Sequence, residues 1–317
     1  MTKTIYIITP SFNAVNTITS TIYSVLKQPP IFKIRYHVQD GGSKDGTIDI
    51  LKQISKKITA SDSQYSHINF SWSSQQDKGM YHAIALAVDR INIPSNAYMG
   101  WINADDLLTP ECLVQISKTI DLFPDILWLG GRPCNIDVEG NYLPLPTFYC
   151  HANEIIRNGL CDGLHFPCLQ QEGMFWKKSL YEAAGGINVA LRLAGDWDLW
   201  RRMAKYTSFV LLPIPTGIFR RRPGQLSSCM KKYHKEIDSI LSRKKRRQAL
   251  RALFPFKDKM LLAPAIQLSP NKKLTLLNIK PSLSLKSKLR IILASRGCYW
   301  VTDLYQALLR IIRRATS

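Results

Sequence analysis

Four short segments that we expect to be strands, each followed by a polar loop, constrain the fold of this chain more than any other feature. They are residues 4–8, 37–40, 70–72 and 98–102. The stretches between them have the apolar period of a helix, and we expect helices at residues 14–27, 47–57 and 79–89. Strands that alternate with helices predict an α/β fold, in which a mainly parallel sheet is flanked by helices on both faces.

Charge divides the chain into two parts. Residues 231–317 contain 21 Lys and Arg against 4 Asp and Glu, a net charge of +17, whereas residues 1–230 carry only +3. We therefore expect a catalytic domain over 1–230 and a basic, mainly helical C-terminal extension over 231–317. Segment 286–314 is amphipathic and cationic, so it either lies on an anionic membrane surface or packs back on the core.

Membrane spans and a disulfide framework are not expected from the sequence. No run reaches the ~18 apolar residues that a spanning helix needs, and no signal peptide precedes the first strand. We expect a cytoplasmic protein, at most peripheral at the inner face of the plasma membrane. The seven cysteines contain no C-x-x-C pair, which favours reduced, buried thiols over disulfides or a zinc ribbon.

Acidic motifs follow several of the predicted strands. Asp40 ends the second strand and precedes Gly41 and Gly42, a pattern that could hold a base or ribose but is also an ordinary turn. Asp105 and Asp106 follow the apolar segment at 98–102. Because polar groups converge at the carboxyl ends of parallel strands, we expect one pocket there.

The pair Asp105 and Asp106 is suited to a hard divalent cation. Two carboxylates on a short loop are typical ligands of Mg²⁺ or Mn²⁺, which keep open positions for diphosphate oxygens. The alternative is that these acids cap the helix expected near Pro110.

Asp196 stands at the start of a probable helix that runs through Ala204, within an aromatic segment. An aspartate beside apolar aromatic rings could act as a general base with a raised pKa. The alternative is that the helix dipole alone favours an acid at this position.

The order of these motifs along the chain indicates a function more specifically than any single motif does. Segments 9–13, 39–47, 74–84, 103–106 and 195–202 together resemble the family 2 glycosyltransferases of GT-A fold, over roughly residues 3–230. The similarity is closest to bacterial members that build exopolysaccharide and surface glycans. It implies transfer of a sugar from a nucleotide-diphosphate sugar to a hydroxyl of a glycan or lipid-linked acceptor, with inversion and with Mg²⁺ or Mn²⁺.

The resemblance also implies roles for individual residues. The nucleotide pocket and the donor side would be formed by Thr9, Ser11, Asp40, Asp77 and Lys78. Asp105 and Asp106 would meet the ribose, diphosphate and metal, and Asp196 would be the base. Two positions depart from the family pattern, since Gly195 replaces a Glu and Asn103 replaces an Asp that many relatives carry.

Two further segments keep alternative interpretations. Arg220–Arg222 could clamp a diphosphate or could be the first solvated charges of the basic extension. His165, together with Gln170–Glu172, could contact an acceptor, although a single histidine is more often structural.

Two other functions would also use features of this sequence. A nucleic-acid-binding module would use the basic extension but would leave the ordered acidic motifs unexplained, so a nucleic-acid partner is not favoured. A nucleotidyltransferase would normally have a glycine-rich basic loop near the N-terminus, and Thr9–Asn13 has neither glycine nor a basic residue.

Overall fold

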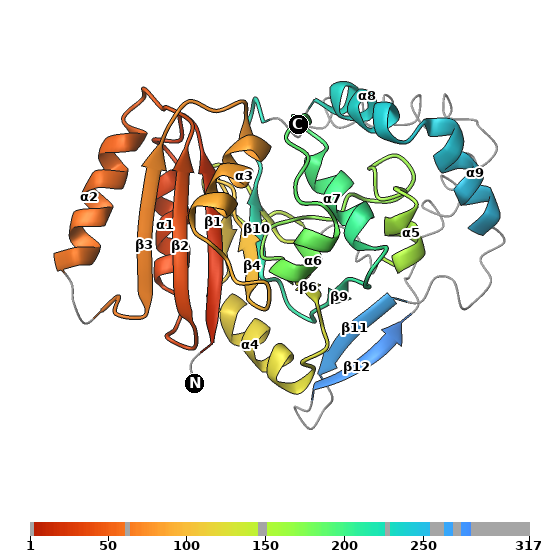
Figure 1. Cartoon of the computed structure of the whole chain (residues 1–317), viewed down its shortest axis with the longest axis horizontal. Helices are drawn as coiled ribbons and strands as arrows, with labels where there is room; N and C mark the ends of the chain where they lie inside the picture. The colour runs from red at the N-terminus through yellow and green to blue at the C-terminus, as the bar shows by residue number, and fades with distance from the viewer. Residues whose placement is uncertain are drawn as a thin grey trace.

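The computed structural model describes residues 3–60, 64–144, 151–225, 229–253, 263–268 and 274–279. Its centre is a nine-stranded sheet in the order β12-β11-β9-β6-β8-β4-β1-β2-β3 (Figure 1). These strands span Thr4–Ser11 (β1), Lys33–Asp40 (β2), Ile68–Ser74 (β3), Tyr98–Trp101 (β4), Trp128–Gly130 (β6), Phe175–Lys177 (β8), Val210–Leu211 (β9), Ala263–Leu268 (β11) and Leu274–Ile279 (β12). A small second sheet has the order β5-β10-β7, with bounds Leu107–Leu108 (β5), Gly217–Arg220 (β10) and Asn135–Ile136 (β7).

The pairing is mixed but mainly parallel, as the sequence predicted. β1 is parallel to β2 and β4, and β2 is parallel to β3. β8 runs antiparallel to both of its neighbours, β4 and β6. The register places Ser11 opposite Asp40 and Asp40 opposite Ser74, so three strands end side by side. The loops that follow these strands therefore meet at one edge of the sheet.

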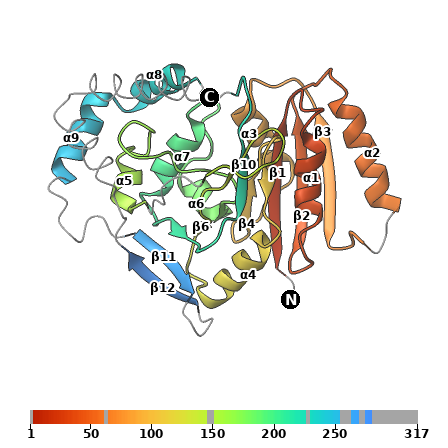
Figure 2. The same cartoon turned by 180° about the vertical axis from the view of Figure 1, so that it is seen from behind.

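Helices cover both faces of the sheet. They span Ile18–Leu26 (α1), Thr47–Ala60 (α2), Met80–Arg90 (α3), Cys112–Leu122 (α4), Asn153–Arg157 (α5), Lys178–Ala183 (α6), Gly195–Met203 (α7), Met230–Ile240 (α8) and Arg243–Leu253 (α9). The apolar residues of α1, α2 and α4 belong to one core, and those of α3, α6 and α7 belong to the core on the opposite face. Figure 2 shows α1 in front of the strands, on the face that Figure 1 hides.

A cluster of indole rings fills the second core. Trp200 of α7 stacks on Trp101 and Trp128, with ring centroids 5.4 and 5.3 Å apart, and meets Trp176 edge-on at 5.1 Å. All four rings are buried. Because such large rings pack with specific geometry, the cluster holds α7 against β4, β6 and β8.

The first helix starts later than the sequence predicted. The backbone amides of Asn13, Ala14 and Val15 lie before α1, and each donates a hydrogen bond to a side chain of residues 43–47. Their acceptors are the oxygens of Ser43, Thr47 and Asp45. The expected helix from residue 14 was therefore wrong for its first turn, because side chains from residues 43–47 compete for these backbone donors.

The described part of the C-terminal extension contains strands as well as helices. α8 and α9 come first, and the β11–β12 hairpin then pairs in parallel with β9, which extends the central sheet. The strands were not expected from the sequence. The amphipathic segment 286–314 lies outside the described residues, and the domain boundary near residue 230 stays a prediction.

Arg246, within the basic run 243–247, lies in the protein interior. Its side chain is fully buried, with Nε 3.1 Å from Oδ2 of Asp162 and Nη1 3.0 Å from Oδ1 of Asp238. Oδ2 of Asp162 also lies 2.8 Å from Nδ1 of His165. Burial alone would raise the pKa of Asp162, but His165 and Arg246 lower it. Asp162 thus ties α9 to the core, and His165 is a second partner of the same carboxylate.

No described helix combines the length and the apolarity needed to cross a membrane. Cysteines 112, 134, 161, 168 and 229 are free thiols in the described part, and the first three are buried.

Arg246→Met should destabilise the protein strongly, because it leaves the buried carboxylate of Asp162 without its guanidinium partner. The expected loss in the free energy of unfolding is about 3–5 kcal/mol. Chemical denaturation measures it, with Lys245→Met as the control, since Lys245 is the exposed neighbour. Equal stability of the two variants would show that the buried pair does not hold α9.

Candidate active site

A cleft of about 900 Å³ opens at the carboxyl ends of β1 to β4, where the sequence predicted one pocket. Its walls come from loops far apart in the chain, and they include residues 10–14, 76–77, 103–105, 168–172, 192–193 and 196. Met230 and Tyr233 of α8 complete one side. The cleft thus draws on both the sheet edge and the basic extension.

On the side of β1 and β2, some of the predicted nucleotide residues line the cleft and others support it. Ser11 lines the cleft, is 4% exposed, and its hydroxyl has no hydrogen-bond partner within the described structure. Thr9 is fully buried below, and its hydroxyl lies 3.0 Å from that of Tyr36. Phe12, 64% exposed, stands at the rim. Phe12 is therefore accessible to a ligand, and the unpartnered Ser11 hydroxyl lies buried in the cleft wall, whereas Thr9 lies beneath it.

Asp40 is turned inward. Its Oδ2 accepts hydrogen bonds from the amides of Gly42 and Ser43, at 3.0 and 2.9 Å, and from the hydroxyl of Ser74. The side chain is fully buried and is not part of the cleft lining. Asp40 thus holds the turn after β2, which is the turn role that the sequence left open.

Asp77 faces the cleft and Lys78 does not. Oδ1 of Asp77 accepts from the amide of Gly79 at 2.6 Å, at the start of α3. A Cβ at Gly41 would lie 2.6 Å from Oδ2 of Asp77, so a side chain at position 41 would displace this carboxylate. Lys78 is exposed, outside the cleft lining.

Asp105 and Asp106 have different surroundings, although they are adjacent. Asp105 lines the cleft, and its Oδ2 lies 2.8 Å from Nε of Arg222. Asp106 is fully buried; its two oxygens accept hydrogen bonds from the amide of Arg220 at 2.9 Å and from Asn103 at 3.1 Å. Burial, and then the charges of Glu172 and Asp105, raise the pKa of Asp106. Asp106 therefore fixes the loop against β10 and does not reach the cleft.

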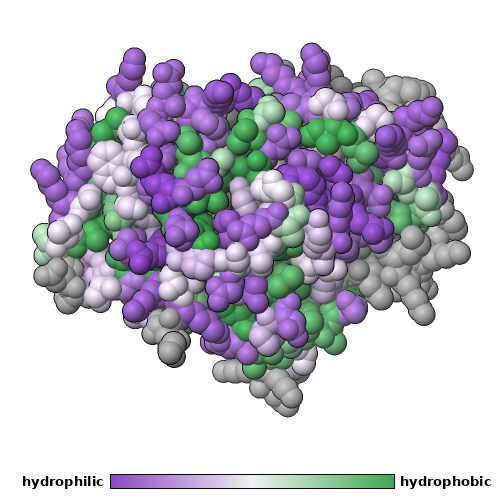
Figure 3. Space-filling model, viewed as in Figure 1, coloured by the Kyte–Doolittle hydropathy of each residue, from purple (hydrophilic) through white to green (hydrophobic). Residues whose placement is uncertain are grey.

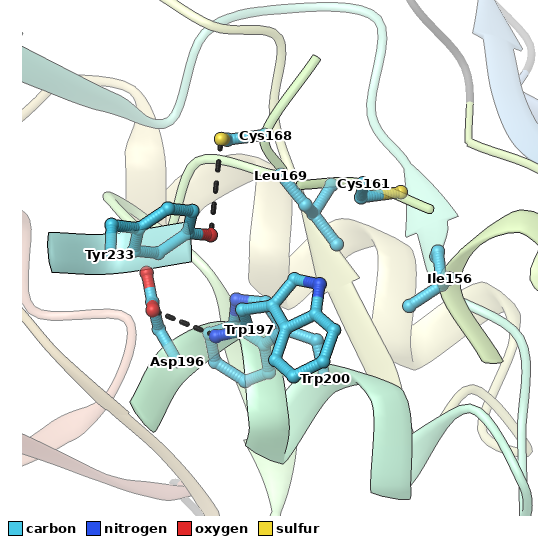
Figure 4. Close-up of a pocket in the computed structure, with 8 residues that line it drawn as sticks. All are labelled: Ile156, Cys161, Cys168, Leu169, Asp196, Trp197, Trp200 and Tyr233. Carbon is cyan, nitrogen blue, oxygen red and sulfur yellow. Dashed lines mark hydrogen bonds between the residues drawn. The ribbon is translucent and has the colours of Figure 1, made fainter. Parts of the chain in front are cut away.

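Asp196 lies where α7 begins and faces the cleft (Figure 4). Its Oδ1 accepts from the amide of Trp197 at 2.7 Å and lies 3.1 Å from the hydroxyl of Tyr81. Burial raises the pKa of Asp196 to about 6, although these two hydrogen bonds act against the rise. A carboxylate with this pKa can accept a proton near neutral pH.

Glu172 is a candidate site residue that the sequence reasoning did not assign. It lines the cleft, and burial together with the charges of Asp196 and Asp105 raises its pKa to about 7. The sequence indicated that the segment Gln170–Glu172 could contact an acceptor, but spacing along the chain could not place Glu172 beside the other acids. The carboxyl groups of Asp77, Asp105, Glu172 and Asp196 therefore line one cleft.

Arg222 gives this acidic cleft a positive group. Its side chain is 44% exposed and lines the cleft while it pairs with Asp105. Nε of Arg220 donates to the carbonyl of Asp105 at 3.0 Å. Of the two interpretations of Arg220–Arg222, a contact with a bound anion is compatible with the position of Arg222.

Tyr233 closes the cleft beside Asp196. A small cavity of about 10 Å³, room for roughly one water, lies between Tyr233, Asp196, Trp197 and Trp200. Figure 4 shows the Tyr233 ring above the carboxylate of Asp196, with the indoles below. Burial raises the pKa of Tyr233 well above its usual value, so its hydroxyl stays neutral.

Comparison with known proteins agrees with this architecture. The family model described as glycosyl transferase family 2 matches residues 6–182. A comparison with curated protein sequences found no match.

Similar solved structures include the crystal structure of S. aureus TarS 1–349 in complex with UDP-GlcNAc. Its sequence is 16% identical to this chain, and the match covers 80% of this chain and 74% of TarS 1–349, with a TM-score of 0.55. Another is the mannosyltransferase PcManGT from Pyrobaculum calidifontis in complex with GDP-Man and Mn²⁺, 15% identical, covering 80% of this chain and 76% of that one, with a TM-score of 0.50. This chain therefore belongs to glycosyl transferase family 2 and is a glycosyltransferase with the GT-A fold.

Proposed function

We propose that this chain is an inverting glycosyltransferase that moves a sugar from a nucleotide-diphosphate donor to the hydroxyl of a glycan or lipid-linked acceptor. The observation that carries the proposal is Asp196, a carboxylate with a raised pKa that shares one cleft with Asp105. The similar structures of TarS and PcManGT are complexes with UDP-GlcNAc and with GDP-Man and Mn²⁺, respectively.

In this proposal Asp196 takes the proton of the acceptor hydroxyl as its oxygen attacks the anomeric carbon of the donor sugar. The bond from that carbon to the diphosphate oxygen breaks, and a single displacement inverts the anomeric centre. The nucleoside diphosphate leaves with a developing negative charge, which the Arg222 guanidinium stabilises. Tyr81 orients Asp196 through its hydroxyl, and Ser11 and Asp77 bind the nucleotide part of the donor.

A divalent cation fits Asp105 better than Asp106. The second oxygen of Asp105 makes no hydrogen bond within the described structure, whereas both oxygens of Asp106 are already bonded to protein donors. In the described part of the chain no three His, Cys, Asp or Glu side chains form a ready metal site. Mg²⁺ or Mn²⁺ would thus be held by Asp105 and by diphosphate oxygens, and when bound it neutralises charge on the leaving group.

The acceptor would enter along the side of the cleft formed by Met80, Leu169, Met230 and Tyr233. An apolar and aromatic wall suits the faces of sugar rings. Beyond this side lie exposed basic residues of α8 and α9, in a region where Figure 3 shows many hydrophilic residues. These basic residues are Lys231, Lys232, Lys235, Lys244, Lys245 and Arg251. We propose that these residues contact an anionic membrane surface, which would suit a lipid-linked acceptor in exopolysaccharide or surface-glycan synthesis.

The proposed function is tested by thermal shift with a panel of UDP, GDP and dTDP sugars, with and without Mn²⁺, followed by an assay of nucleoside diphosphate release. One donor should raise the melting temperature and be turned over when an acceptor glycan is added. A chain that binds none of these donors, and releases no nucleotide, would not be the transferase proposed here.

Asp196→Asn should abolish transfer and preserve donor binding. Loss of a general base lowers the rate by about 10²–10⁴-fold, while the donor Kd should stay within about threefold, since the amide keeps the shape of the side chain. Single-turnover kinetics and calorimetry measure the two quantities. Asp49→Asn, on the exposed surface of α2, is the control. Transfer at the wild-type rate by Asp196→Asn would exclude the base assignment.

Asp105→Asn should remove the effect of Mn²⁺ on donor binding, whereas Asp106→Asn should retain it. A lost metal ligand should weaken donor binding in Mn²⁺ by about tenfold or more, as measured by titration calorimetry with and without the metal. The reverse pattern, in which only Asp106→Asn loses the Mn²⁺ effect, would assign the metal to Asp106.

The rate of transfer should rise with pH through about 6, because Asp196 accepts a proton only when its carboxyl group is ionised. Below that pH the protonated carboxyl group cannot act as a base. A profile of kcat/KM between pH 5 and 8 measures this acid limb, and its absence would mean that another group is the base.

A further inference from the structure

The start of α7 lacks a cap from its own sequence. Ala194 occupies the capping position and has no side-chain oxygen, so no side chain there accepts a hydrogen bond. The amides of Arg192, Leu193 and Ala194 lie just before the helix that carries Asp196, and they need acceptors from elsewhere.

Glu236, from the middle of α8, supplies them. Its carboxylate accepts from the amide of Arg192 at 3.1 and 3.2 Å, from Leu193 at 2.8 Å and from Ala194 at 3.0 Å. Three consecutive backbone donors on one carboxylate form an anion-binding nest at a helix N-terminus. A residue more than 40 positions away thus fixes the backbone next to Asp196.

This segment is joined directly to the proposed base. The carbonyl of Leu193 lies 3.1 Å from the Tyr81 hydroxyl, which lies 3.1 Å from Oδ1 of Asp196 as well. A Cβ at Gly195 would come within 2.6 Å of the Tyr81 ring, so a side chain at 195 could not be accommodated without displacing Tyr81. Position 195 therefore does not supply an acceptor for these amides, whereas Glu236 of α8 does.

Several charged or titratable groups surround Asp196. They are Tyr81 on α3, Tyr233 and Glu236 on α8, Glu172 before β8, Cys168, and Arg192 at the cleft wall. The negative charge of Glu236 adds to the burial that raises the pKa of Asp196. Glu236 thus acts on the base both through the backbone and through its charge.

We propose that Glu236 is a positioning residue, which holds residues 192–194 so that Asp196 and Tyr81 keep their arrangement in the cleft. The inference rests on the proposed role of Asp196 as the base. It assigns α8, part of the basic extension, to the active site of the enzyme.

The test compares Glu236→Gln and Glu236→Ala with the wild-type protein. We expect kcat to fall on the order of tenfold for Glu236→Gln and a hundredfold for Glu236→Ala, with the donor KM within about twofold. The acid limb of the pH profile should move to lower pH in Glu236→Gln, because a negative charge next to Asp196 is lost. Glu182→Gln, which removes a surface charge paired with Lys178, is the control and should change neither quantity.

Two measurements do not depend on transfer activity. Hydrogen exchange of the wild-type protein should show protected amides at 192–194, and Glu236→Gln should expose them selectively. The ¹³C titration of the Asp196 carboxyl, identified by its loss in Asp196→Asn, should shift to lower pH in Glu236→Gln. Unprotected amides in the wild-type protein, or an unchanged Asp196 titration with wild-type kcat, would overturn the proposal.

These readouts separate the two hypotheses. If the wild-type protein turns over no donor while the amides and the titration respond to Glu236→Gln, the proposed function fails and the positioning role stands. If Glu236→Ala does not fold, the wild-type exchange experiment still decides the question.

Discussion

The bond between a carboxylate and unpaired backbone N–H groups is the interaction on which the rest of this structure depends. Loops leave strands and begin helices all around the cleft, and their amides have no partner in regular structure. Acidic side chains accept them, and each one fixes a loop at the sheet edge or at a helix start. They are Asp40, Asp45, Asp77, Asp106, Asp162, Asp196 and Glu236.

The same acids set the electrostatics of the cleft. Asp106 is buried among protein donors, so its charge adds to that of Asp105 and Glu172 without being available to a ligand. Asp77, Asp105, Glu172 and Asp196 face the cleft. Burial, and then the charges of Asp196 and Asp105, raise the pKa of Glu172, whereas burial and then the charge of Glu236 raise that of Asp196. Arg222 is the cationic side chain that offsets this charge beside Asp105. A divalent cation bound with the donor would offset the negative charge of the diphosphate, which the acidic side chains of the cleft would otherwise repel.

The basic extension is also more closely tied to the body than its charge suggests. α8 supplies Glu236 to the start of α7 and Tyr233 to the cleft wall, and α9 buries Arg246 against Asp162. Net charge reports solvation and possible partners, but it does not report which single side chains are buried. The proposed membrane contact therefore concerns the exposed lysines and arginines of these helices.

The sequence by itself determined the order of strands and helices up to about residue 102, the meeting of their loops at one sheet edge, and most of the acids that are candidates for chemistry. Those features follow from local periodicity and from the geometry of parallel sheets. Only the tertiary structure decided which way each acid points: Asp40 and Asp106 turn inward, while Asp105 and Asp196 face the cleft. It also brought Glu236 to α7 and joined four tryptophans in one core. These outcomes depend on donors and rings from distant segments, and no local pattern encodes such contacts.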